Sequence, residues 1–186
     1  MEGETLIVVG RGDPSMKEAP LRLEMGYVYL VESRIRDIAH TNESTAPELL
    51  AAFNEAWRVL DNYVTRLKAE AVLGKRTLDR ERAKLVVDEI PAIIEAKDLP
   101  NTRDIRDSLV LMDPTYQEYE ERVAYIDATL MLMEGKKKAM EMAYTAVKKI
   151  IGGNALSTRR VLNVDPNEQQ EPGVTSPTSG FGTPRY

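Results

Sequence analysis

Two short groups of acidic side chains have a spacing at which carboxylates can do chemistry. Asp104 and Asp107 are about one helical turn apart, and Glu118, Glu120 and Glu121 form a cluster further along the chain. Carboxylates that share a helix face can hold Mg²⁺ through their oxygens. A solvated helix face is the more frequent cause of this pattern, so we expect these residues to face water.

The chain lacks the residue types on which most catalytic and metal sites depend. Its 186 residues include no cysteine and one histidine, His40. This composition excludes a thiolate metal site, a cysteine nucleophile and a multi-histidine zinc site. His40 has no Glu-x-x-His context, and no Gly-rich phosphate loop or Ser-His-Asp motif is present. We therefore expect no enzymatic activity, no cofactor and no metal.

Basic side chains are concentrated in two islands, although the whole chain has a net charge of -5. The first basic island, residues 66–84, sums to +4, and the second, residues 135–160, sums to +6. Together they favour a polyanion partner, because phosphate binding grows with the number of cations presented. Helix C-termini and solvated coiled-coil flanks explain each island equally well when it is taken alone. The candidate nucleic-acid-binding residues are Lys75, Arg76, Arg80, Arg82, Lys136 and Lys138.

The longest predicted helix presents the second basic island. Asp113 is its expected N-cap, Pro114 its first residue, and Gly152-Gly153 its expected end. At 1.5 Å per residue it is roughly 57 Å long. Its apolar positions recur at steps of three and four residues and form one apolar stripe, or seam, along the helix. Burying this seam requires an antiparallel partner in the chain, a second copy, or both. The candidate oligomerisation residues are Tyr119, Val123, Ile126, Leu130, Met133, Lys137, Met140, Tyr144 and Val147.

An earlier helical region must present the first basic island. Thr45-Ala-Pro-Glu48 has the form of a capping box and starts another apolar seam. Gly74 is expected to interrupt this seam, and a second helix is expected from about Leu78, with a kink at Pro91. A short helix over residues 103–112 then leads to the longest one.

The N-terminal residues are more ambiguous. Residues 5–9 fit a short strand or an extended arm that must dock on something. Arg11-Gly12-Asp13 matches an adhesion motif, but such matches are common by chance, and Gly12-Asp13-Pro14 predicts a turn. Residues 21–31 alternate like a strand, yet the helical spacing continues further, so we favour a helix over residues 19–40.

These patterns predict an all-α protein with elongated helical hairpins and a long C-terminal coiled-coil helix. No run of about 18 apolar residues is present, so we expect no membrane partner. The expected organisation is an extended arm (residues 1–18), an N-terminal helical unit (19–101), a long-helix oligomerisation unit (102–153) and a disordered or extended, flexible tail (154–186).

One set of positions in the second half of the chain matches a known pattern. The positions are Asp107-Ser-Leu-Val-Leu-Met-Asp113, then Tyr125, Leu130, Gly135, Ala139 and Ala146-Val-Lys-Lys-Ile150. With an early helix and a Lys/Arg-rich helix upstream, they make residues 19–151 resemble the UvsY-type recombination mediators of bacteriophages.

The resemblance implies an all-helical, non-enzymatic protein of the host cell cytoplasm that forms a ring-like homo-oligomer through its C-terminal helices. Such mediators bind single-stranded DNA, help displace the single-strand-binding protein and load the recombinase. Their DNA-contacting Lys-x-Arg-Leu segment has its nearest match at Gly74-Lys75-Arg76-Thr77-Leu78, where the two cations are adjacent.

Two other hypotheses remain open at this point. A bacteriophage structural or assembly protein of the head, neck or tail would reside in the virion and bind its neighbours through the arm, the long helix and the tail. A plain helical interaction module would have no DNA role.

Overall fold

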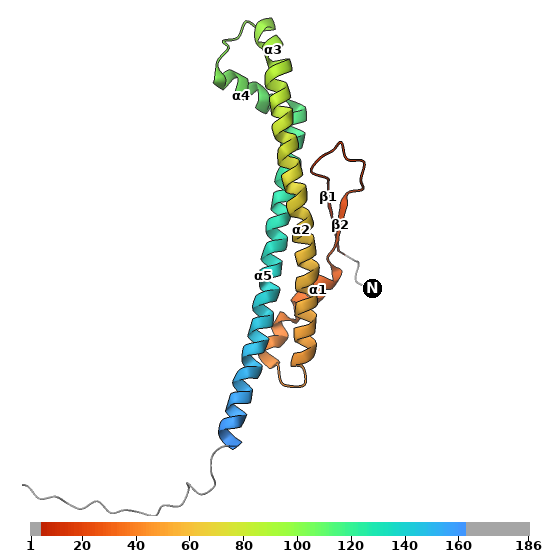
Figure 1. The fold of residues 1–186 in the computed structure, drawn as a ribbon, viewed down its shortest axis with the longest axis vertical. Coiled ribbons are helices and arrows are strands. Elements are labelled where there is room, and N and C mark those ends of the chain that lie inside the picture. The colour runs from red at the N-terminus through yellow and green to blue at the C-terminus, as the bar shows by residue number, and fades with distance from the viewer. Residues whose placement is uncertain (1–4, 163–186) are drawn as a thin grey trace, which may run out of the picture.

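The chain folds into a long antiparallel helical hairpin (Figure 1). The computed structural model describes the backbone of residues 5–162 and the side chains of residues 5–153. Helix α2 (Ala46–Lys84), a π-helical turn η2 (Leu85–Glu89) and helix α3 (Ile90–Ala96) form one arm, and α5 (Pro114–Leu162) returns alongside α2. The predicted all-α class, with its long C-terminal coiled-coil helix, is confirmed.

The core between α2 and α5 repeats every seven residues, as the apolar spacing predicted. Heptad spacing keeps one stripe of each helix turned toward its partner. The α5 seam therefore finds its antiparallel partner inside the chain. Side chains with no exposed surface on these stripes are Phe53, Leu60 and Leu67 in α2, and Ile126, Met133, Met140 and Val147 in α5.

Smaller elements close the two ends of the hairpin (Figure 1). Helix α4 (Arg103–Met112) has the predicted bounds and covers a second cluster around Leu85, Ile90 and Tyr116. Helix α1 (Gly26–Ser33) and a 3₁₀ segment, η1 (Arg34–His40), pack at the opposite end beside α2 and α5.

The predicted starts of α2 and α5 are correct, but one capping interaction differs. Helix α5 begins at Pro114, and the Asp113 carboxylate accepts the Tyr116 amide hydrogen at 2.8 Å. The Thr45 side chain makes no capping bond at the start of α2. Asn42 has this role instead, because its side-chain oxygen accepts the Thr45 amide hydrogen at 3.0 Å and its carbonyl accepts that of Ala46.

Two predicted helix breaks were wrong. Helix α2 runs through Gly74 and past Leu78, and α5 runs through Gly152-Gly153 to Leu162. A helical glycine costs only about 1 kcal/mol relative to alanine, which the surrounding helical hydrogen bonds and packing offset. Residues 154–162 of the predicted tail are therefore helical, and its remaining residues, 163–186, lie outside the described part of the chain.

Pro91 is accommodated by the π-helical turn that precedes it. The Ile90 amide donates to the Leu85 carbonyl, one residue further back than in an α-helix. Proline removes a helical donor, and a π-turn is one way in which a helix absorbs the mismatch.

An N-terminal β-hairpin replaces part of the predicted helix over residues 19–40. Strand β1 (Leu6–Val9) pairs antiparallel with β2 (Leu21–Glu24), and Val9 lies opposite Leu21. The alternation at the start of this segment was therefore a strand signal: Leu21 and Leu23 are buried. Helical structure begins only at Gly26, so the helical spacing was misleading for the residues before it.

The hairpin loop docks on α2 through a buried carboxylate and two glycines. Glu70, which is 5% exposed, forms an ion pair with Arg11 and accepts the Gly12 amide hydrogen at 2.8 Å. A Cβ atom on Gly12 would lie 2.0 Å from the Glu70 carbonyl oxygen and 2.6 Å from the Gly74 nitrogen. The two backbones therefore approach so closely that only glycine fits at position 12.

Asp13 forms the predicted turn beside this contact. Its carboxylate accepts hydrogen bonds from the Ser15 hydroxyl at 2.6 Å and the Ser15 amide at 2.9 Å. These hydrogen bonds, with a smaller contribution from the charge of Arg80, lower the pKa of Asp13. The adhesion-motif residues therefore act as a turn and a docking loop.

We predict that Gly12→Ala lowers the free energy of unfolding by about 3 kcal/mol, because backbone atoms of α2 must shift to admit the methyl group. Urea denaturation followed by circular dichroism measures the change. Gly10→Ala is the matched control, because the nearest atoms to its Cβ belong to Arg122 at 4.0 Å. Equal stability of the two variants would contradict the docking contact.

Candidate nucleic-acid interface

The first basic island lies beside the acidic half of α5. Lys75 pairs with Asp127 at 2.9 Å, and Lys68 pairs with Glu134 at 2.8 Å. Because α5 runs antiparallel to α2, these pairs match the cations of one helix to the carboxylates of the other. Part of the island therefore supports the alignment of the two helices.

Arg82 is also paired within the chain. It donates to the Asp107 carboxylate of α4 at 2.7 Å, and Arg103 lies 3.6 Å from the same carboxylate.

Glu118, in the other predicted acidic group, pairs with Arg122 at 3.0 Å. Among the described residues, no group of three His, Asp or Glu side chains is arranged to hold a metal ion.

Lys136 of the second island is a packing residue. Its ammonium lies 2.6 Å from Glu32 of α1 and 4.6 Å from the centre of the Tyr29 ring, and its side chain is only 13% exposed. Lys137 is held similarly, 2.6 Å from Asp61 and 4.8 Å from the Trp57 ring. Lys136 is therefore committed to the contact between α5 and α1.

Three arginines of α2 form the strongest remaining cation site. Arg66, Arg76 and Arg80 are all exposed on α2. The ion pairs found within the described residues include none of the three. Along the helix they span roughly 21 Å. We call Arg66, Arg76 and Arg80 the outer arginine row.

The arginines of the outer arginine row repel one another, and a bound anion would reduce this repulsion. Arg76 and Arg80 are four residues apart, a spacing at which like charges repel by about 0.2–0.5 kcal/mol. Arg66 belongs to the first basic island but was not among the candidate residues. Helical spacing was the signal that could have placed it with Arg76 and Arg80, because all three fall on one side of a 3.6-residue repeat.

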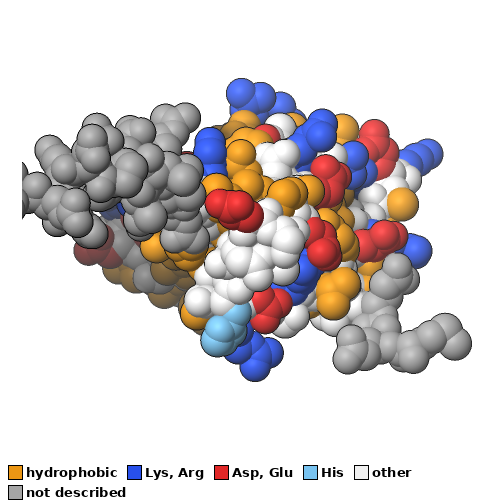
Figure 2. Space-filling view, turned by 90° about the horizontal axis from the view of Figure 1, so that it is seen from below, with side chains coloured by type: hydrophobic (Ala, Val, Ile, Leu, Met, Phe, Trp, Pro, Cys, Tyr) orange, Lys and Arg blue, Asp and Glu red, His pale blue; other side chains and the backbone are white. Residues whose placement is uncertain are grey.

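The candidate residues of the two basic islands lie at different levels along the hairpin. Lys137 lies beside Asp61, whereas Lys75 lies further along α2 beside Asp127. Lys138, the remaining candidate, is exposed on α5. Figure 2 looks along the hairpin from the α1 end and shows Lys and Arg interspersed with Asp and Glu on the visible face.

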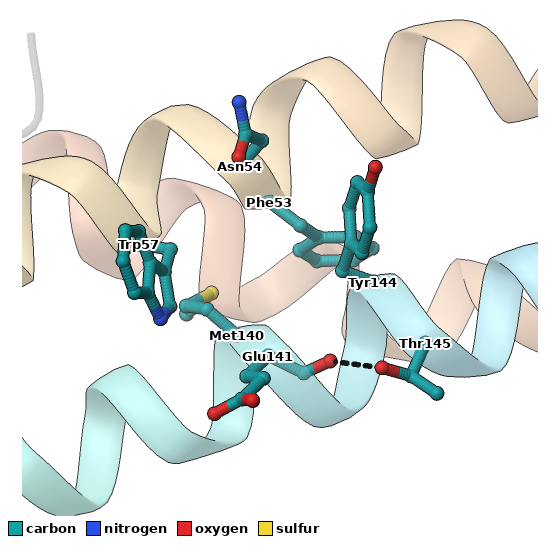
Figure 3. Close-up of a pocket in the computed structure, with 7 residues that line it drawn as sticks. All are labelled: Phe53, Asn54, Trp57, Met140, Glu141, Tyr144 and Thr145. Carbon is teal, nitrogen blue, oxygen red and sulfur yellow. Dashed lines mark hydrogen bonds between the residues drawn. The ribbon is translucent and has the colours of Figure 1, made fainter.

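An aromatic groove between α2 and α5 accompanies the second island (Figure 3). Phe53 and Trp57 from α2 line it together with Met140 and Tyr144 from α5. Phe53 is fully buried, and Trp57 and Tyr144 are half-buried against the core. Figure 3 also shows the Thr145 hydroxyl donating to the Glu141 carbonyl at 2.9 Å. These rings mainly pack the two helices together.

Tyr125 is the tyrosine best placed to stack on a base. It is 50% exposed, whereas Tyr116 is buried and Tyr119 is half-buried. Its hydroxyl donates to the Val8 carbonyl at 3.4 Å, so the side chain also contacts the N-terminal hairpin.

The nine candidate oligomerisation residues lie on the side of α5 that packs inside the chain. Met133 and Met140 are fully buried, and Leu130 and Tyr144 pack against the same core. A second copy could reach this seam only by displacing α2. Oligomerisation through these residues stays a prediction, and the folded hairpin does not leave them free for it.

The opposite side of α5 carries an apolar surface that sequence reasoning missed. Met131 is 73% exposed, Met142 64% and Leu132 45%. Their spacing with neighbouring small residues is helical, but the stronger seam on the other side of the helix obscured it. We call this set the outer stripe; its members are Ala124, Ala128, Met131, Leu132, Gly135, Ala139, Met142 and Ala146.

We predict that Lys136→Ala lowers the free energy of unfolding by about 2 kcal/mol, because it removes a charge-assisted hydrogen bond that is largely buried. Lys138→Ala should change stability by less than about 0.5 kcal/mol, because that side chain is exposed. Urea titration of both variants measures the difference. A Lys138 variant as unstable as the Lys136 variant would contradict this assignment.

None of the described helices is long and apolar enough to cross a membrane. Comparison of the chain with protein-family models, curated proteins and solved structures finds no match. The function therefore has to be inferred from the residues and contacts described above.

Proposed function

We propose that this protein is a non-catalytic recombination mediator that binds single-stranded DNA as a homo-oligomer. The outer arginine row is the observation that supports the proposal most directly. Its three guanidinium groups are exposed and form no ion pair among the described residues, and Arg80 interacts only weakly with the charge of Asp13. They can therefore bind phosphates without breaking an ion pair of the fold.

A homo-oligomer is part of the proposal because one row is a weak site. Three cations neutralise few phosphates, and linked copies gain affinity when one strand reaches several of them. The acidic surface of the same chain is suited to basic protein partners. The proposed partners are a recombinase and a single-strand-binding protein. The resemblance to UvsY-type mediators supports the same role.

We predict that Arg76→Ala weakens binding to single-stranded oligonucleotides of every sequence. It should reduce the slope of log affinity against log salt by about 0.7 per chain, the value expected for one lost phosphate contact. Fluorescence anisotropy of a labelled oligothymidine over a salt series measures both quantities.

Lys75→Ala is the matched control, since it removes the same charge at the neighbouring position. Lys75 is already paired with Asp127, so its loss should leave the salt slope unchanged and cost less than about 1 kcal/mol of stability. Absence of binding by the wild-type protein at low salt would refute the proposed function. An equal effect of both variants would refute the outer arginine row as the site.

A second candidate is a bacteriophage structural or assembly protein. The exposed apolar side chains of the outer stripe favour it, because such surfaces mark protein contacts. This candidate requires no single-stranded DNA affinity. Salt-independent self-assembly of a protein that binds no oligonucleotide would support it over the mediator.

A further inference from the structure

The outer stripe is arranged almost as a mirror image about Gly135. Ala128 and Met142 lie equally far before and after this glycine, as do Met131 and Ala139. We propose that two copies of the chain pair through their outer stripes, with the two α5 helices antiparallel and a two-fold axis passing beside Gly135.

Antiparallel pairing about Gly135 places a large side chain against a small one. Met131 of one copy lies opposite Ala139 of the other, and Met142 lies opposite Ala128. By the two-fold symmetry each pairing occurs twice. Large and small residues on facing positions interdigitate without voids, whereas facing methionines would hold the helices apart.

Charge selects the same direction of pairing. When the α5 side chains paired with α1 and α2 are left out, residues 114–134 of α5 have a net charge of -2 and residues 135–153 have a net charge of +2. Antiparallel copies therefore place each acidic half against a basic half. Glu121 and Lys149, both exposed, are equally far from Gly135 and would face each other at the two ends of the interface. Parallel copies would place like charges together.

No packing contact of the described chain requires a glycine at position 135. A Cβ atom added to it would have no neighbour within 4 Å. An exposed glycine in the middle of a helix is destabilising relative to alanine. At the axis of a dimer, however, the absence of a side chain lets the two helix backbones approach closely.

The stripe is long enough for a specific contact. From Ala124 to Ala146 it extends roughly 33 Å along the helix. Met131 and Met142 are among the most exposed large apolar side chains of the described residues. On the other side of α5 lie α2, α1 and the β-hairpin, which leaves the outer stripe accessible to a second copy.

This interface deepens the proposed function by naming its self-association contact, and its tests involve no DNA. Loss of DNA binding with an intact dimer would contradict only the proposed function. A homo-oligomer that binds DNA but is unaffected by substitutions in the outer stripe would contradict only the interface.

The first test uses Gly135→Ala in the full-length chain. Analytical ultracentrifugation should show a dimer whose dissociation constant rises about tenfold or more, because a methyl group is forced between the backbones. At concentrations too low for dimerisation, the same variant should melt about 2–4 °C higher, because alanine favours the helix. A wild-type chain that stays monomeric at high concentration overturns the proposal.

Gly152→Ala is the matched control. Gly152 is in the same helix, lies off the outer stripe and also has open space around its Cβ position. It should raise the melting temperature without changing the dissociation constant. Equal dissociation constants for the Gly135 variant and the wild type overturn the proposal.

The second test determines the direction and alignment of the pair. The chain has no cysteine, so single cysteines report unambiguously. When the M131C and A139C proteins are mixed and oxidised, the disulfide between the two different proteins should predominate. Predominance of disulfides between identical proteins indicates a parallel pair and overturns the proposal.

Charge reversal provides an independent check. Glu121→Lys and Lys149→Glu should each weaken the dimer severalfold, and the chain with both substitutions should regain the wild-type dissociation constant. A double variant weaker than either single variant overturns the antiparallel pairing, because the restored ion pairs exist only in that arrangement.

Discussion

Burial of the α5 seam against α2 is the contact on which the rest of the structure depends. Each large apolar side chain that leaves water there contributes about 1.5–3 kcal/mol, and the fully buried residues recur along much of the hairpin. Neither helix could keep so long an apolar stripe in water. Their pairing decides which charges meet, which surfaces stay exposed and where the smaller elements dock.

The charges follow from that pairing. Cations of the first basic island face the carboxylates of the acidic half of α5, and Lys136 is held by Glu32 of α1. A basic island in the sequence is thus partly a set of internal ion pairs. Lys75 and Arg76 are neighbours in the chain, yet the helix turns one toward Asp127 and the other toward solvent. This difference makes the outer arginine row a better candidate for nucleic-acid binding than the islands as a whole.

The hairpin also separates the two apolar faces of α5. One face packs within the chain, and the other, centred on Gly135, remains exposed. Intramolecular folding and self-association can therefore use opposite sides of a single helix without competing. The loop of the β-hairpin is held on α2 by Glu70 and by the close approach of Gly12 to Gly74.

Local patterns were sufficient for much of this fold. Heptad spacing identified the buried stripes of both long helices, and Asp113-Pro114 located the start of α5, because such signals act within one or two helical turns. They were insufficient at Leu21 and Leu23, where a strand partner far away in the sequence decides between strand and helix.

The pairing of the cations and the exposure of the side chains depended on contacts between segments far apart in the sequence. In the sequence, Gly74 resembles a helix break, but in the structure it is the position against which Gly12 packs. Lys136 resembles a free cation in the sequence, but in the structure it is paired with Glu32. The chain alone determined an all-helical protein with two basic islands and no cysteine. Only the tertiary structure decided which cations remain available to a partner, because pairing and burial join residues that lie far apart in the sequence.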